Sequence, residues 1–468
     1  MAKKKRIEVL DVVDFSEKGE GVGRWKNKKV LLPFTIPGEK VEAEIGKGRK
    51  GLIRGKVKAV LEKSPFREDS PCPYFQACGG CTFQHLSYSK ELEWKYHLVR
   101  RTLKKALPSF SEKKILPPLE SPQIYRYRNK MELSFSRKRW LTTEEIQSQN
   151  EFRKDFALGM HVRGRFDRVV YLRQCHLLSQ KAEELLSKIG PFFEASGLSI
   201  YHSKSHEGFL RFAILREAFH TGEIMVNWVS SIRNEAFAKE VASFLAGQGA
   251  YTVINNISSR WAQVSYGDQE YVDHGLGYIL EKLGDFTFQI SSQSFFQVNT
   301  LQVERMYRLI PQWLELRKED IVYDFYSGIG TISIYLSPHV KKVIGFEIIP
   351  QAIQNSLQNC EINRVQNCQF IQGDVKDYFQ NPSSPSLPKP QVILLDPPRP
   401  GVHPKVLSCI LQIRPREILY ISCNPLTLAR DLAYLTEKGD YDIQKVQPID
   451  MFPRTPHIES LVLLKLRK

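Results

Sequence analysis

Cys423 is a lone cysteine at the point where an apolar strand, expected at 417–421, meets a helix that begins near Leu426. A thiol at a helix N-terminus lies in the positive partial charge of unpaired N–H groups, which lowers its pKa and favours the nucleophilic thiolate. Free cysteines are also common as small, inert core residues. This segment alone leaves both interpretations open, and the other motifs of the chain favour the nucleophile.

The segment 324–331 predicts a binding loop for a nucleoside cofactor. It follows an expected strand and opens a helix, and its two glycines let a ligand approach the backbone closely. Glu347 ends the next strand, where a carboxylate can accept hydrogen bonds from both ribose hydroxyls. A dinucleotide fits less well, because Ser333 replaces the third glycine of the G-x-G-x-x-G pattern. S-adenosylmethionine has a ribose and no phosphate, so it fits better, and Asp374 after the third strand is placed to meet the adenine.

The turn Asp396-Pro397-Pro398-Arg399 indicates which kind of atom is modified. It follows an expected strand at 392–395, at the edge where ligands of parallel sheets bind. Methyltransferases that act on exocyclic amines have a related Asp/Asn-Pro-Pro turn followed by an aromatic residue, and they need no covalent nucleophile. Here Arg399 replaces the aromatic residue and Cys423 lies at the next strand edge. The combination indicates methylation of carbon.

Methylation of a pyrimidine carbon requires both a nucleophile and a base. Uracil C5 is too weakly nucleophilic to attack a methylsulfonium until a thiolate adds to C6, after which a base must remove the C5 proton. Glu459, just before the expected strand 460–464, is the candidate base, and His457 competes for the role. Without the other motifs, Glu459 would more often be the solvated flank of a strand.

Four cysteines form a candidate metal site. Cys72, Cys78 and Cys81 are closely spaced, and Cys175 can supply a distant fourth ligand. Zinc sites built from four cysteines usually show two pairs of closely spaced ligands, whereas three clustered cysteines and a distant fourth are typical of an iron–sulfur cluster. The spacing favours the cluster over zinc, and a shielded structural patch of cysteines is the third interpretation.

Three regions of different character must position these residues. Residues 1–63 hold short β-rich runs separated by Gly and Lys turns, which predicts a small β-barrel. Residues 64–290 contain the four cysteines and then mostly strand-like segments, which predicts a mostly β or α+β central iron–sulfur domain. In residues 291–468 strands alternate with helices, which predicts an α/β domain with a doubly wound parallel sheet. The helix at about 89–105 is a candidate to pack on this catalytic domain.

The charge of the chain indicates a polyanionic partner. The net charge is +16, and residues 1–63 alone hold 17 Lys/Arg against 9 Asp/Glu. Nucleic acid is the first candidate, and a solvated basic face is the alternative. No apolar run approaches the length of a membrane span, so we expect a cytoplasmic protein with no membrane partner. No obligate protein partner is evident, and we expect a monomer.

Together, these motifs resemble the RNA 5-methyluridine methyltransferase family, in particular its iron–sulfur branch that modifies ribosomal RNA. The resemblance covers almost the whole chain. It includes the basic barrel, which is similar to a TRAM domain, and the four cysteines. The remaining matching motifs are residues 296–299, 324–331, 396–401, 422–425 and 457–459.

The resemblance implies a Rossmann-like class I methyltransferase sheet and methylation of uracil C5 in 23S rRNA. It implies that Cys423 is the nucleophile, that Glu459 accepts the C5 proton and that the four cysteines bind a [4Fe-4S] cluster. The positions that fall on the family's S-adenosylmethionine pocket are Gln297, Tyr326, Thr331, Glu347, Asp374 and Asp396. Gln297 and Asp396 are also expected to meet the uracil. One departure is Arg454, where the family has histidine, and it affects the expected substrate contacts.

Three alternatives remain. A tRNA uracil-C5 methyltransferase would share the same chemistry. An RNA cytosine-C5 methyltransferase would carry another cysteine beside the Asp-Pro-Pro turn, and 397–399 has none. A non-catalytic RNA-binding protein would have lost Cys423 or Glu459, and both are present.

Overall fold

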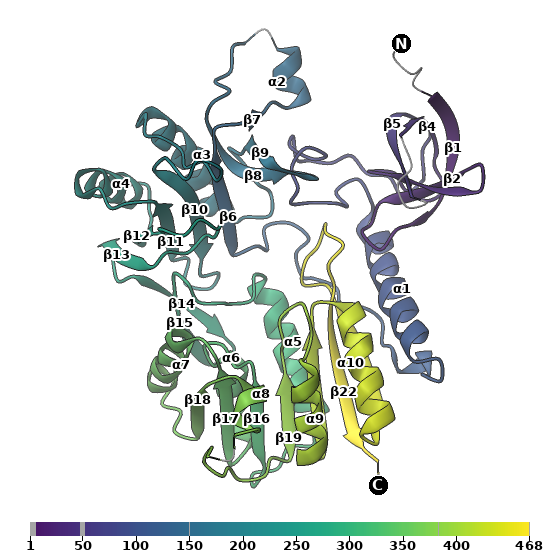
Figure 1. Ribbon diagram of the computed structural model, residues 1–468, viewed down its shortest axis with the longest axis vertical. Coiled ribbons are helices and arrows are strands. Elements are labelled where there is room, and N and C mark those ends of the chain that lie inside the picture. Colours follow the sequence, from purple (N-terminus) through teal and green to yellow (C-terminus); the bar gives the residue numbers. More distant parts are fainter. Residues whose placement is uncertain (1–5, 47–51, 149, 382, 468) are drawn as a thin grey trace.

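The structure is a computed structural model that describes residues 6–46, 52–148, 150–381 and 383–467. A closed barrel, an eight-stranded sheet and a seven-stranded sheet follow one another along the chain (Figure 1). Part of the basic charge expected for the barrel falls on residues outside the described ranges. The architecture confirms the predicted α/β class with an N-terminal barrel, while the domain boundaries at 63 and 290 stay predictions.

The N-terminal barrel closes in the strand order β1-β2-β3-β5-β4. Its strands are β1 (Arg6–Phe15), β2 (Gly21–Trp25), β3 (Lys28–Leu32), β4 (Lys40–Ile45) and β5 (Ile53–Glu62). Alternating apolar residues such as Leu10, Val30 and Val41 fill the interior. Phe15 instead packs edge-on against Phe83 and Trp94, which attaches the barrel to the helix that follows.

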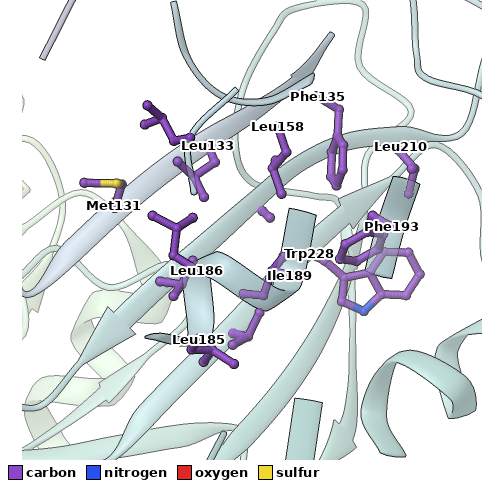
Figure 2. Close-up of a cluster of buried hydrophobic side chains, with 14 of the residues drawn as sticks. Met131, Leu133, Phe135, Leu158, Leu185, Leu186, Ile189, Phe193, Leu210 and Trp228 are labelled. Atoms are coloured by element: carbon purple, nitrogen blue, oxygen red, sulfur yellow. The ribbon is translucent and has the colours of Figure 1, made fainter. Parts of the chain in front are cut away.

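The central sheet has the order β13-β12-β11-β10-β6-β8-β9-β7. Its strands are β6 (Lys130–Ser136), β7 (Arg139–Trp140), β8 (Ala157–Val162), β9 (Arg165–Tyr171), β10 (Leu210–Glu217), β11 (Ile224–Ser230), β12 (Thr252–Ile257) and β13 (Gln269–His274). The helices of this region are α2 (Thr143–Gln147), α3 (Gln180–Ala195) and α4 (Glu235–Gly247). Figure 2 shows Leu186 and Phe193 of α3 against Leu133, Leu158 and Trp228 of the strands. The hairpin β14 (Tyr278–Leu283) and β15 (Phe286–Ser291) leads into the last sheet.

The C-terminal sheet has the order β18-β17-β16-β19-β20-β22-β21. The first five strands are parallel, β22 is antiparallel to β20, and β21 is antiparallel to β22. Its strands are β16 (Ile321–Phe325), β17 (Lys342–Glu347), β18 (Cys368–Gln372), β19 (Val392–Leu395), β20 (Glu417–Ser422), β21 (Tyr441–Ile449) and β22 (Glu459–Leu466). Its helices are α5 (Thr300–Trp313), α6 (Thr331–Leu336), α7 (Pro350–Ile362), α8 (Val375–Tyr378), α9 (Pro404–Ile413) and α10 (Pro425–Lys438). The strands are near-continuous apolar runs because helices cover the sheet. No helix in the described part of the chain is long and apolar enough to cross a membrane.

Helix α1 (Tyr88–Ala106) comes before the central sheet in sequence but lies beside α10 of the C-terminal sheet (Figure 1). Val99 and Leu103 of α1 share a buried cluster with Leu428 and Leu432 of α10. The short 3-10 turns are η1 (Glu112–Lys114) and η2 (Ser337–His339). The packing of α1 on α10 places the segment after the barrel against the sheet that carries the candidate nucleophile.

Candidate active site

Cys423 and Glu459 come together through the register of two neighbouring strands. Cys423 directly follows β20, and Glu459 is the first residue of the antiparallel neighbour β22. The register pairs Ser422 with Ser460, so the next position along each strand brings Cys423 opposite Glu459. Asn424 then caps α10, its side chain accepting a hydrogen bond from the Leu426 backbone N–H at 3.1 Å. The strand register therefore places a thiol and a carboxyl side by side at one edge of the sheet.

The electrostatics of this edge differ from the expectation for Cys423. Burial, with Glu459 next in effect, raises the pKa of the Cys423 thiol to about 11. The predicted lowering of this pKa is wrong, because desolvation and nearby carboxylates outweigh Arg399 and the backbone N–H of Cys423. Burial also raises the pKa of Glu459 to about 8 and the pKa of Asp396 to about 7. Such carboxyls exchange protons near neutral pH, as a general base must.

His457 is the weaker of the two candidate bases. Burial and the neighbouring Arg399 lower the pKa of His457 to about 4. Both of its ring nitrogens lie 3.4 Å from the Arg399 guanidinium Nη2. A group with this pKa is neutral at physiological pH but binds a proton far less strongly than Glu459 does. The two pKa values therefore favour Glu459 as the proton acceptor.

Two cavities meet at this edge. One of about 220 Å³ is lined by Cys423, Asn424, Arg399 and His457, among others. A larger cavity of about 840 Å³ shares Arg399 and His457 and extends along β6, β8 and β10 of the central sheet. Its wall includes three further cationic residues, Arg128, Lys130 and Arg216. Its size is within the range of ligand pockets, and its cations suit a polyanionic ligand.

The predicted cofactor residues gather around the loop after β16. Gln297, Tyr326, Thr331 and Asp396 line one narrow cavity with Phe295 and Asp324. Two predicted residues lie outside that lining. Glu347 accepts a hydrogen bond from the Gly328 backbone N–H at 3.0 Å, and Asp374 caps α8 and pairs with Lys376 at 2.8 Å. Asp374 is nevertheless close enough to contribute, after burial, to raising the pKa of Tyr326 to about 12.

Ser333, which stands where a dinucleotide fold has glycine, has a partner of its own. Its hydroxyl donates a hydrogen bond to the buried carboxylate of Asp324 at 2.6 Å. Burial raises the pKa of Asp324 to about 7. Among the described residues, Asp324 Oδ1 and Ser327 Oγ are buried without a hydrogen-bond partner. Unpaired buried polar atoms beside a cavity are suited to a ligand with hydrogen-bond donors and acceptors.

Two site residues were not predicted from the sequence. Asp324 lies near the end of the apolar strand β16, and an acidic residue in that position is itself a signal. Phe295 is 67% exposed and lines both the large cavity and the cofactor cavity. An aromatic ring in that position can contact both a base and the cofactor. Its proximity to Gln297 in the sequence was the available clue.

The four cysteines line the far part of the large cavity together. All four are free thiols, and burial raises the pKa of Cys78 to about 12 and that of Cys175 to about 11. Gly79 allows the tight wrap of this loop, because a Cβ there would lie 2.9 Å from the His161 carbonyl oxygen. In the part of the chain that the structure describes, no group of three or more His, Cys, Asp or Glu side chains is arranged to hold a metal ion. The iron–sulfur cluster therefore stays a prediction.

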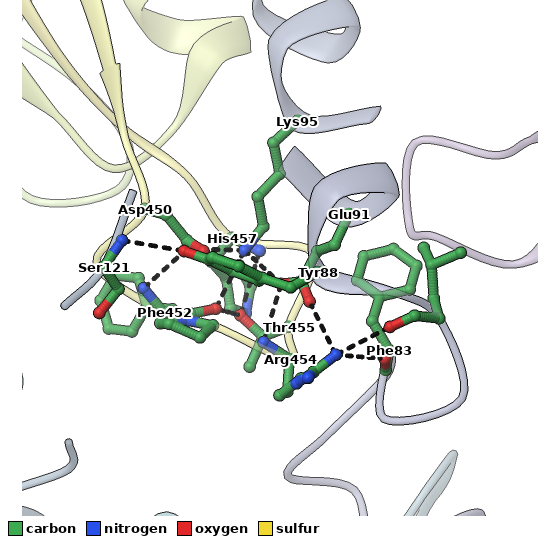
Figure 3. A network of polar contacts seen from close by, with 12 residues as sticks. Phe83, Tyr88, Glu91, Lys95, Ser121, Asp450, Phe452, Arg454, Thr455 and His457 are labelled. Atoms are coloured by element: carbon green, nitrogen blue, oxygen red, sulfur yellow. Dashed lines mark hydrogen bonds and ion pairs between the residues drawn. The ribbon is translucent and has the colours of Figure 1, made fainter. Parts of the chain in front are cut away.

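A buried ion network fixes the loop that leads to Glu459 (Figure 3). Lys95 of α1 donates hydrogen bonds to Glu91 and Asp450, each at 2.7 Å, and to the Phe452 carbonyl at 3.1 Å. The Lys95, Glu91 and Asp450 side chains are fully buried. Burial alone would lower the pKa of Lys95, but Asp450 and Glu91 more than offset it and the pKa is raised. Lys95 is therefore a permanent positive charge between two carboxyls.

Arg454, the departure from the family pattern, belongs to the same loop. Its backbone oxygen accepts hydrogen bonds from Thr82 and Phe83, next to Cys81, at 2.7 and 3.1 Å. Its guanidinium donates to the Leu86 carbonyl at 2.8 Å, and the residue is only 3% exposed. Arg454 thus joins the cysteine loop to the loop before Glu459 and presents little surface to a substrate.

Comparison with known proteins identifies the family of the chain. The family described as tRNA (Uracil-5-)-methyltransferase matches residues 224–382 and 388–467, and the TRAM domain family matches residues 3–58. An uncharacterized RNA methyltransferase of Chlorobaculum tepidum is 38% identical, over 97% of this chain and 95% of its own length. Another from Caldanaerobacter subterraneus is 35% identical, over 99% of this chain and 100% of its own length.

A solved structure extends the likeness to three dimensions. The crystal structure of the Pyrococcus abyssi tRNA (uracil-54, C5)-methyltransferase with S-adenosyl-L-homocysteine is similar at a TM-score of 0.75 and 28% identity. The alignment covers 97% of this chain and 99% of that one. The chain belongs to the uracil-5-methyltransferase family of RNA-methylating enzymes and carries an N-terminal TRAM domain.

Proposed function

We propose that this protein methylates C5 of a uridine in RNA, with S-adenosylmethionine as the methyl donor. The observation that carries the proposal is the pairing of Cys423 with Glu459 across β20 and β22, beside a cavity with cationic walls. Family membership supports the reaction, and the similar Pyrococcus abyssi enzyme was solved with S-adenosyl-L-homocysteine.

The loop after β16 fits S-adenosylmethionine. Gly328 has a left-handed φ of 57°, and a Cβ there would meet nothing within 4 Å, so the backbone is open to a ligand. The unpaired atoms of Asp324 and Ser327 offer further hydrogen-bonding sites. When bound, the donor supplies an electrophilic methyl group. We assign Glu347 to the ribose hydroxyls and Asp374 to the adenine. We assign the part of the cofactor that carries the methyl group to Gln297, Tyr326, Thr331 and Asp396.

Cys423 and Glu459 act in turn on the uracil, Cys423 as the nucleophile and Glu459 as the proton acceptor. The Cys423 thiol releases its proton to solvent and its sulfur bonds to C6 of the uracil, while the C5–C6 π electrons shift to form an enolate whose C5 is nucleophilic. After C5 is methylated, the Glu459 carboxylate accepts the C5 proton. The C6–S bond then breaks, which restores the C5–C6 double bond and releases the thiolate. We assign Gln297 and Asp396 to orienting the uracil, because Asp396 is close enough to raise the pKa of both Cys423 and Glu459, and Gln297 contacts Asp396.

The proposed substrate is 23S rRNA, by resemblance to the iron–sulfur branch of the family. A tRNA is the second candidate, because the similar Pyrococcus abyssi structure is a tRNA enzyme. The test is mass spectrometry of nucleosides from purified 23S rRNA and tRNA, in cells with and without the gene. Loss of 5-methyluridine from 23S rRNA alone is expected. Loss from tRNA alone selects the second candidate, and no loss from either contradicts the proposed function.

We also propose that Cys72, Cys78, Cys81 and Cys175 hold a [4Fe-4S] cluster, which when bound would tie the cysteine loop to the central sheet. The donor set fits, because four free thiols line one wall of one cavity. Anaerobically purified protein should contain about four irons per chain. Zinc without iron in such a preparation contradicts the cluster.

A further inference from the structure

The loop 258–268, between β12 and β13, displays a tryptophan that the reaction described above does not use. Trp261 is 75% exposed. Its indole stacks on the His206 imidazole, with 4.9 Å between centroids and 18° between planes. A hydrogen bond of 3.1 Å between the Tyr201 hydroxyl and His206 Nδ1 fixes the orientation of the imidazole. One face of the indole is therefore supported, and most of the remaining ring is open to solvent.

A buried arginine holds this loop in place. Arg211 of β10 is only 2% exposed. Its guanidinium donates to the Ser258 carbonyl at 2.6 Å and to the Ala262 carbonyl at 2.7 Å, on either side of Trp261. It also lies over the Tyr201 ring at 4.1 Å. A single exposed apolar residue needs no explanation. Here, however, the loop that carries Trp261 is fixed by hydrogen bonds from a buried arginine, so the indole is held in place before any ligand binds.

The same loop adjoins the large cavity. Ser265 donates a hydrogen bond to Glu132 of β6 at 2.9 Å, and Glu132 lines the cavity wall beside Lys130 and Arg216. Phe212, next to Arg211 on β10, lines the cavity as well. A polyanion that occupies the cavity can therefore continue onto the 258–268 loop. Single-stranded nucleic acid is bound by this combination of cationic surface and exposed aromatic rings.

We propose that Trp261 is a stacking platform for an unpaired base of the RNA substrate, outside the methylation site. The inference rests on the proposed function for the identity of the ligand. The indole would take a base on its exposed face while His206 supports the other face. Because every base has a π-face, this contact adds affinity without reading sequence. It would hold the strand that flanks the target uridine.

The test is binding of a short fluorescein-labelled single-stranded RNA, and of the same RNA in a duplex, by the full-length protein. Stacking contributes about 1–3 kcal/mol per base, so Trp261→Ala should weaken single-strand binding by roughly 5- to 150-fold. Trp261→Phe should retain most of the affinity. Phe166→Ala is the matched control, because Phe166 is an 88% exposed aromatic on β9, near the other edge of the same sheet.

Two further readouts distinguish stacking from a general loss of structure or charge. The slope of affinity against salt should not change in Trp261→Ala, because no phosphate contact is removed. In methylation assays the KM for RNA should rise while kcat at saturating RNA stays the same. Wild-type affinity in Trp261→Ala, or an equal loss in Phe166→Ala, overturns the platform. If wild-type protein binds RNA through Trp261 but methylates no uridine, the proposed function fails and the platform stands.

Discussion

Substituting Lys95 with methionine tests how much the buried ion network contributes to the fold around Glu459. The change keeps an apolar stem of similar length but leaves Glu91 and Asp450 without their shared cation, and both side chains are fully buried. Breaking a buried pair typically costs 3–5 kcal/mol, so we expect a loss of about 4 kcal/mol. For a region of this size, that corresponds to a fall in melting temperature of roughly 8–16 °C.

The assay is thermal unfolding of the full chain at neutral pH, with Lys90→Met as the matched control. Lys90 is on the same helix and pairs with Glu93 at 2.6 Å, but its side chain is 32% exposed and that of Glu93 is 51% exposed. Exposed pairs contribute about 0–1 kcal/mol, so this control should melt close to wild type. Adding Glu91→Gln and Asp450→Asn to Lys95→Met should restore much of the lost stability, because the two carboxylates left without Lys95 are then neutral, while Arg454 keeps its pairing with Glu68 at 3.8 Å.

The pH dependence of Lys95→Met has a defined sign. Burial already raises the pKa of Glu91 in the folded wild type to about 7, and Lys95 opposes that rise, so removing Lys95 should raise this pKa further. Stability from such groups is present at low pH and is lost as the pH rises through the folded pKa. The difference from wild type should therefore shrink on acidification. Equal melting temperatures for Lys95→Met and Lys90→Met at neutral pH would refute the reasoning.

The remaining predictions concern catalysis and RNA binding. Cys423→Ala should abolish methyl transfer but leave S-adenosylmethionine affinity, measured by calorimetry, within about twofold of wild type, because the thiol acts only on the base. Since the pKa of Glu459 is raised to about 8 and its carboxylate is the active form, kcat/KM should fall about tenfold per pH unit below that value; a flat profile there contradicts Glu459 as the base. Replacing the exposed Lys28 and Lys29 of the barrel with alanine should weaken RNA binding and reduce the salt slope by about 1 for each phosphate that is no longer neutralised; an unchanged slope shows that these charges only solvate the barrel.

The sequence predicted the strands of the catalytic sheet well, because β16, β17, β19 and β20 are apolar runs bounded by turns. It also predicted that chemistry would gather at their carboxyl ends, which follows from parallel topology. The pairing of Cys423 with Glu459 is different in kind. It depends on the antiparallel register of β20 with β22, which residue spacing does not determine.

The electrostatic state of the site was not predictable from local sequence. A helix N-terminus favours a thiolate, but the pKa of Cys423 is raised because it is buried beside Glu459. Both effects depend on packing between segments far apart in the chain. The same holds for Lys95, which contacts Asp450 across 355 positions of sequence. A lysine within an amphipathic helix gives no sign that it is buried until its partners are known.

The most direct test of the proposed mechanism is to look for a covalent enzyme–RNA adduct in Glu459→Gln. With glutamine in place of the base, the methylated uracil cannot lose its C5 proton, so the bond from Cys423 to C6 should persist. After incubation with substrate RNA and S-adenosylmethionine, a denaturing gel should show a shifted protein band. Digestion and mass spectrometry should then find a methylated uridine on the peptide that contains Cys423. Normal turnover without an adduct, or an adduct on another residue, would contradict the assignment of Cys423 and Glu459.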